Sequence, residues 1–133
     1  MTMKEAVISV FENYANFSGR ARRSEYWFFV LFDIVAPVAV LTALSLFGGS
    51  ERLLGLVSSA YYLGTFIPRL ALIWRRLHDI NKSGPCFFWI LFPVAGIIMF
   101  LIWMCREGTY GPNRYGPDPR ESAFRAGKNP WEY

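Results

Sequence analysis

The sequence predicts an all-α membrane protein in which three transmembrane helices follow an amphipathic interfacial helix and precede a turn-rich C-terminal tail. Three apolar blocks indicate this class: residues 26–47, 53–74 and 86–105, together 64 of 133 residues. A helix needs about 20 apolar residues to cross the hydrocarbon of a bilayer, so each block fits one crossing. Charged residues are only 18% of the chain, against about 25% in ordinary soluble domains. A soluble fold would have too little polar sequence to cover three buried helices, so residues 1–133 are expected to form one membrane domain.

The first element expected is a helix over residues 2–17. Apolar residues recur there at spacings of three and four, with polar residues between them, which is the pattern of an amphipathic helix. The apolar stripe consists of Met3, Val7, Val10, Phe11, Tyr14 and Phe17. Ahead of a membrane span, such a helix would lie in the interface with its stripe toward the lipid. The alternative is that the stripe packs on a partner protein or on the loops.

Each of the three spans, 26–47, 53–74 and 86–105, contains one proline: Pro37, Pro68 or Pro93. Proline has no backbone N–H, so the carbonyl four residues earlier loses its helical partner. Membrane helices tolerate this where a neighbouring group satisfies the carbonyl. We therefore expect kinks at the prolines, and contacts from other elements at those kinks.

Charged residues gather at the ends of the spans that share one membrane face. The set comprises Arg22, Arg23, Glu25, Arg75, Arg76, His78, Asp79 and Lys82. If the second helix continues past Trp74, Asp79 can meet Arg75 or Arg76 on its surface. Exposed pairs of this kind contribute little to stability. We therefore interpret the set as a juxtamembrane polar cluster whose basic side chains, with His78, contact anionic headgroups. The alternative for His78 is a group that titrates near neutral pH.

Two charges lie inside the apolar blocks, Asp33 in the first and Arg69 in the second. Antiparallel neighbouring helices would place both roughly 10 Å below the same face, since the helical rise is about 1.5 Å per residue. A lone charge inside the membrane is costly, so the matched depth favours a pair. Such a pair would act as a staple that fixes the register of the helices, or as a polar site or switch. A third possibility is that the two side chains make no contact.

The tail, residues 106–133, is rich in turn-forming residues, and its Tyr-Gly-Pro triplet occurs twice. Its turn motif contains Asn113, Arg114, Tyr115, Gly116 and Asp118. We expect a compact series of turns near the membrane surface, followed by a polar end.

Three segments together resemble the signatures of the domain of unknown function 805 family: FSGRARRSEYW (17–27), RRLHDINKSG (75–84) and NRYGPDP (113–119). Their order and spacing also agree, over nearly the whole chain. Pro85-Cys86 departs from the family pattern, which usually has a tryptophan pair there, and this leaves the entry of the third span open. The resemblance implies a small multi-pass protein of the bacterial inner (plasma) membrane. It carries no established activity, so no catalytic or ligand-binding residues follow from it.

The expected function is that of a membrane protein without catalytic activity, a small helical bundle that binds lipid headgroups or protein partners, with a homo-oligomer as one form. The alternative is a subunit of an oligomeric transporter or channel that uses Asp33 and Arg69. One His and two separated Cys do not form a zinc site, and neither a metal nor another cofactor is expected. A bilayer accounts for the net charge of +4, so nucleic-acid binding is not expected.

Basic residues favour the cytoplasmic side of a membrane, but in a three-span chain they divide seven against six. The preferred orientation has a cytoplasmic N-terminus, because more of its basic residues adjoin the spans. A second topology replaces the third span by a re-entrant segment bent at residues 93–96. That bend would bring both tails to one side and place the Tyr-Gly-Pro turns beside the 75–79 cluster.

Overall fold

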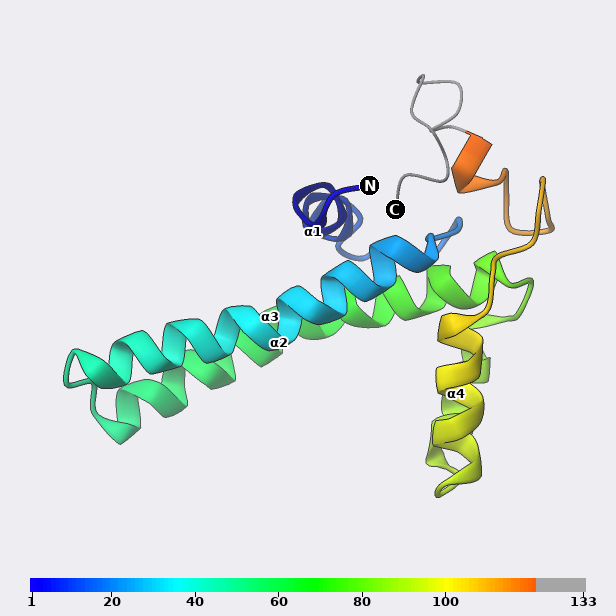
Figure 1. Cartoon of the computed structure of the whole chain (residues 1–133). Coiled ribbons are helices and arrows are strands. Elements are labelled where there is room, and N and C mark those ends of the chain that lie inside the picture. Colours follow the sequence, from blue (N-terminus) through cyan, green and yellow to red (C-terminus); the bar gives the residue numbers. More distant parts are fainter. Residues whose placement is uncertain (122–133) are drawn as a thin grey trace.

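The computed structural model describes residues 1–121. All the secondary-structure elements longer than a single turn or bridge in that range are helices. The helices are α1 (Met3–Glu12), α2 (Arg23–Leu46), α3 (Glu51–Asp79), the 3₁₀ helix η1 (Gly84–Leu91) and α4 (Ala95–Cys105). Helices α2 and α3 form a long hairpin, α1 crosses it near the start of α2, and α4 runs across the hairpin direction (Figure 1). The all-helical prediction is confirmed.

Helices α2 and α3 are long and apolar enough to cross a membrane. With 24 and 29 residues, they measure about 36 Å and 43 Å at the usual helical rise. Each includes its predicted proline, Pro37 or Pro68. Between them, Gly48 has φ of +80°, and the Ser50 side chain accepts a hydrogen bond from the Leu53 amide at 3.2 Å, which caps the start of α3. Helix α3 continues past Trp74, as the charged pairs require.

The third predicted span is not one helix. Its residues fold into η1 and α4, which turn back on each other, and α4 has only 11 residues. The turn centres on Val94, whose φ of +61° and ψ of −66° close a γ-turn through a 2.7 Å bond from the Ala95 amide to the Pro93 carbonyl. The chain therefore bends at residues 93–96, as in the second topology. We call residues 84–105 the apolar hairpin.

Helix α1 is shorter than predicted. A capping box between Thr2 and Glu5 begins it, and it ends at Glu12. Its stripe faces the chain's own spans: Val10 is buried, and the Phe11 ring meets the Phe29 ring at 6.2 Å. Part of the stripe therefore packs on the chain's own helices rather than facing lipid. Met3, Phe11 and Tyr14 remain exposed.

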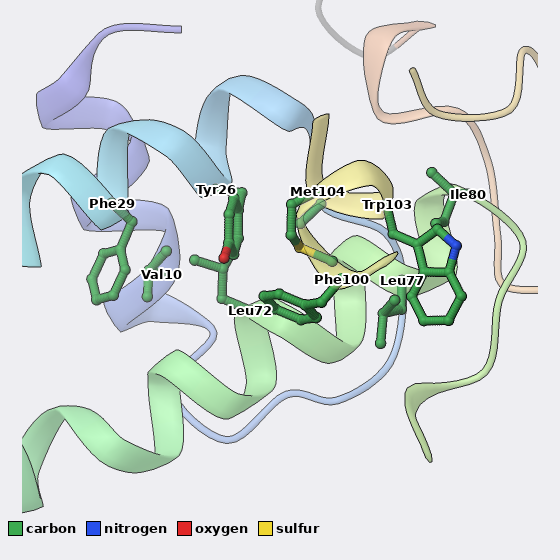
Figure 2. Close-up of a cluster of buried hydrophobic side chains, with 10 residues drawn as sticks. Val10, Tyr26, Phe29, Leu72, Leu77, Ile80, Phe100, Trp103 and Met104 are labelled. Carbon is green, nitrogen blue, oxygen red and sulfur yellow. The ribbon is translucent and has the colours of Figure 1, made fainter. Parts of the chain in front are cut away.

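The hydrophobic core lies at one end of the hairpin, where α1, α2, α3 and α4 converge. Figure 2 shows Val10 and Phe29 on one side of this core and Leu77, Phe100, Trp103 and Met104 on the other. At the opposite end, Leu46 and Phe47 are 82% and 91% exposed. The hairpin is thus packed only near the residues that the charged motifs occupy.

Candidate functional site

Six charged side chains are buried where the three sequence motifs meet, Asp118 and a charge cluster of five. This charge cluster consists of Arg20, Glu25, Arg75, Arg76 and Asp79. Charged residues are rarely buried unless they are paired, and each of these is. Asp79 lies between two guanidiniums, with Arg20 at 2.9 Å and Arg76 at 2.8 Å. Removing one partner of such a buried pair typically costs about 3–5 kcal/mol.

Arg75 does not pair with Asp79. It bonds Glu25 at 3.1 Å, and the Ser9 hydroxyl of α1 donates to the same carboxylate oxygen at 3.1 Å. The predicted contact between Arg76 and Asp79 is present, but it is buried rather than exposed. The prediction that Arg75 and Arg76 contact headgroups is wrong, because both side chains are buried in ion pairs that join segments of the fold.

Residues 106–121, the C-terminal segment, are held by arginine donors. Arg20 donates to the Gly111 carbonyl at 2.7 Å and to the Thr109 carbonyl. Arg76 donates to the Arg106 carbonyl, and the Thr109 amide donates to the Asp79 carbonyl at 2.8 Å. A Cβ at Gly108 would lie 2.0 Å from the Asp79 carboxylate. Only glycine allows the segment to pass this close to the cluster.

The predicted turn motif is anchored on the end of α3. The Asn113 side chain donates to the His78 carbonyl at 2.9 Å, and the Tyr115 ring stacks on the His78 ring at 3.9 Å. His78 Nδ1 also lies 3.1 Å from the Gly19 carbonyl oxygen. Gly116, with φ of +135°, pairs with the Asn113 backbone. His78 is buried, so the prediction that it contacts headgroups is wrong.

Asp118 links two parts of the C-terminal segment, around Gly111 and Arg120. It accepts hydrogen bonds from the Arg120 side chain and amide and from the Gly111 amide. Burial opposes ionisation of the Asp118 carboxyl, but these hydrogen bonds outweigh it and hold its pKa below the ordinary value. The bond to Asp118 also raises the pKa of Arg120.

Four basic residues of the prediction lie at the edge of the cluster. Lys82 Nζ sits 4.8 Å from the centre of the Trp103 ring, and the Arg114 guanidinium is 4.7 Å from that of Tyr115. The Arg22 side chain donates to the Pro119 carbonyl at 3.0 Å. Arg23 is the most weakly held: it is 53% exposed, 4.0 Å from Glu107 and 3.4 Å from the Cys105 carbonyl.

The predicted contact between Asp33 and Arg69 is present, at 2.8 Å. The Tyr61 hydroxyl donates to Asp33 at 2.9 Å, and Arg69 also donates to the Thr65 hydroxyl at 3.0 Å. Arg69 Nε has no hydrogen-bond acceptor among residues 1–121. The network ties α2 to α3 in one register and leaves the Arg69 side chain 32% exposed.

Two cavities flank the charge cluster. The first, of about 410 Å³, is bounded by the first turn of α2 and by the C-terminal segment. Its lining includes Arg22, Arg23, Trp27, Phe28, Glu107 and Arg120, and we call it the basic cavity. The second, of about 320 Å³, lies between α1 and the connector to α2 and includes Arg75 in its lining. Within the described range, no group of three His, Cys, Asp or Glu side chains is placed to hold a metal ion.

Sequence reasoning missed Arg20, Thr109 and Arg120 as members of the site. Arg20 stands inside the first signature, two residues farther from the first span than Arg22. Nearness to the span predicts a role for Arg22 and Arg23, whereas in the fold Arg20 is the residue that reaches Asp79. The repeated Tyr-Gly-Pro triplet predicts turns in the C-terminal segment. It does not predict that the backbone carbonyls of these turns accept hydrogen bonds from Arg20.

The sequence is similar to those of known inner-membrane proteins. The model of the family described as "Protein of unknown function (DUF805)" matches residues 14–117. Inner membrane protein YhaI of Escherichia coli K12 is 45% identical over 113 residues, which cover 85% of this chain and 93% of the relative. Inner membrane protein YhaH of the same strain is 38% identical over 115 residues, covering 85% and 94%. No solved structure matches the chain.

Proposed function

The chain belongs to the DUF805 family and is a bacterial inner-membrane protein, and from this premise we propose that it is a non-catalytic helical bundle whose basic end binds anionic lipid headgroups. The observation that carries the proposal is the position of the basic residues. The fold gathers them at the packed end of a two-helix membrane hairpin. Three properties support the proposal: the depth of the hairpin in the membrane, its orientation and the exposure of its basic side chains.

Depth follows from helix length. About 20 residues cross the hydrocarbon, which corresponds to residues 27–46 of α2 and 53–72 of α3. Helix α3 extends seven residues beyond that stretch, to Asp79. The charge cluster, at this extension and at the start of α2, therefore lies at the headgroup level, where water and lipid phosphates are within reach.

Orientation follows from the number of spans. With two spans, both ends of the described chain are on the same side of the membrane. Ten Lys and Arg residues of the range 1–121 then lie at the packed end, and only Arg52 lies in the opposite turn. The positive-inside rule assigns the packed end to the cytoplasm. This division of charge supports a cytoplasmic position for the packed end.

Exposure separates structural arginines from those available to lipid. The charge cluster is occupied by its own ion pairs, whereas four basic residues near it are exposed: Lys4, Arg23, Arg106 and Arg114. Each such residue contributes about 1 kcal/mol of attraction to an anionic surface. Glu25, Asp79 and Asp118 are held by arginines and His78 is stacked on Tyr115, which supports binding rather than proton-transfer chemistry.

The test is the lipid composition around the full chain in nanodiscs made from equal parts phosphatidylglycerol and phosphatidylcholine. We expect phosphatidylglycerol to be enriched relative to empty discs. Changing the four exposed basic residues to Gln should abolish the enrichment, and Arg52→Gln, in the opposite turn, should preserve it. Equal composition in loaded and empty discs would contradict the proposal.

A second candidate is a subunit of an oligomeric transporter or channel, favoured by the partly exposed pair of Asp33 and Arg69. Asp33→Arg and Arg69→Asp, alone and combined, separate the two functions. If the pair is only a staple, each single change lowers the folded yield and the double change restores it. If the pair is a translocation site, the yield is normal and ion flux into liposomes changes.

A further inference from the structure

The basic cavity lies where a lipid headgroup would meet the fold. It opens between the first turn of α2 and residues 107–120, and its lining passes from Trp27 and Phe28 to arginines. In Figure 1 the C-terminal segment, in orange, lies at the end of the hairpin where α2 begins. Aromatic residues of this kind mark the level of the membrane interface. The cavity therefore has an apolar side toward the span and a polar side away from it.

The charges on its lining favour an anion. Three arginines, Arg22, Arg23 and Arg120, face it together with Asp79 and Glu107. Both oxygens of Asp79 already accept from guanidiniums, Oδ1 from Arg20 and Oδ2 from Arg76. The arginines thus exceed the carboxylates by one unit of positive charge, and the buried carboxylate is already neutralised.

Two of the arginines, Arg23 and Arg22, would gain from an additional negatively charged partner. The contacts of Arg23 are long and its side chain is half exposed, so it can turn to a new acceptor at little cost. Burial lowers the pKa of Arg22, and attraction to Glu25 and Asp118 only partly offsets the effect. A negative charge in the cavity would relieve that cost. Arginine binds phosphate oxygens in a bidentate manner, with more geometric specificity than lysine.

We propose that the basic cavity seats the phosphate of one anionic phospholipid, bound by Arg23 with Arg22 and Arg120, while the lipid chains run along Trp27 and Phe28. This site rests on the proposed function and sharpens it, because it replaces a diffuse attraction to the membrane surface by one defined position. Arg120 belongs to the C-terminal segment, so the seat is complete only when that segment is docked.

The test uses the full chain in a non-ionic detergent, with phosphatidylglycerol binding measured by native mass spectrometry. Arg23→Gln should weaken the binding of the first lipid about fivefold, the loss expected for one arginine at a lipid phosphate. Arg23→Lys should keep part of the affinity. Arg106→Gln is the comparison within the exposed basic set: Arg106 does not line the cavity, so its loss should be clearly smaller than that of Arg23→Gln. Arg52→Gln, at the opposite end of the hairpin, is the control and should change the affinity less than twofold. Excess soluble glycerophosphate should not displace the lipid.

Each outcome decides one step. Equal losses in Arg23→Gln and Arg106→Gln would overturn the seat and leave a diffuse lipid preference, which is the proposed function alone. Displacement by glycerophosphate would show that the site takes a free phosphate compound and would overturn a lipid occupant. If the unaltered chain binds phosphatidylglycerol no better than phosphatidylcholine, the proposed function fails together with the seat. Because Arg23 is exposed, Arg23→Gln is expected to fold normally, and an unchanged unfolding temperature checks this.

Discussion

At the scale of single residues, Pro68 shows how a local defect is repaired from elsewhere in the chain. Pro68 deprives the Gly64 carbonyl of its helical N–H, and the Tyr14 hydroxyl donates to that carbonyl at 2.6 Å. The sequence predicts a contact at this proline, because the freed carbonyl can be counted from the residue number alone. It cannot show that Tyr14, 50 residues earlier, supplies the donor, since that depends on where α1 crosses α3.

A double-mutant cycle tests this repair. Tyr14→Phe should lower the free energy of unfolding in detergent by about 1 kcal/mol, the usual net value of one hydrogen bond. In a Pro68→Ala background, α3 supplies its own amide to Gly64, so the same change should cost almost nothing. Tyr62→Phe, at an exposed tyrosine on α3, serves as the control. An equal cost of Tyr14→Phe in both backgrounds would contradict the repair.

Asp118 gives the C-terminal segment a defined pH dependence. Because its pKa is lower in the folded chain than the ordinary 3.8, its contribution to stability is complete above that value and is lost as the pH falls through the folded pKa. We expect the protection of residues 106–120 against hydrogen exchange, measured relative to the intrinsic exchange rate at each pH, to fall below about pH 4. Asp118→Asn should show fast exchange already at pH 7, with a flatter acid response. Identical profiles for both chains would refute this assignment.

At the scale of elements, the apolar hairpin shows why composition predicts one long helix where the chain forms two short ones. Residues 86–105 are long, uncharged and apolar, which are the properties by which a span is recognised. The break depends instead on Pro93, on the positive φ of Val94, and on Gly96, where a Cβ would lie 1.9 Å from the Trp89 carbonyl oxygen. Proline and glycine are visible in the sequence and indicate a bend, but only the packing of η1 against α4 turns the bend into a reversal.

Gly96→Ala tests this reversal, because the added methyl group cannot fit between α4 and the Trp89 carbonyl. It should destabilise the chain by about 2 kcal/mol or more, as overpacking does, seen as a lower unfolding temperature in detergent. Gly55→Ala is the matched control: a Cβ there meets nothing within 4 Å, and alanine favours a helix over glycine, so stability should stay equal or rise. A neutral Gly96→Ala would mean that 84–105 does not fold back.

At the scale of the whole molecule, the charged residues could be found from the sequence but their burial could not. The motifs identify Arg75, Arg76 and Asp79, and helical spacing predicts the contact between Arg76 and Asp79. Arg75 turns instead to Glu25, 50 residues earlier. A cluster of charges between two apolar blocks resembles a solvated turn until the C-terminal segment is placed over it.

Reporter fusions after Ser50, Asn81 and Glu121 test the two-span arrangement in cells. A periplasmic reporter should be active only after Ser50, and a cytoplasmic one after Asn81 and Glu121, because the ten basic residues then share one side. The fusion after Asn81 is the internal control, since both topologies place it with the N-terminus. A periplasmic signal after Glu121 would restore a third span.

The arginine-held C-terminal segment also sets an order of events during synthesis. Arg20 and Arg76 leave the ribosome well before the carbonyls of residues 104–116 that they bind, so the long hairpin is already made while these two arginines have Asp79 as their acceptor but not yet those carbonyls. Translation must run to the last turns of the chain before the cluster can close. A message cut short upstream of residue 109 would yield a protein with both long helices but without the Thr109 and Gly111 carbonyls that hold Arg20.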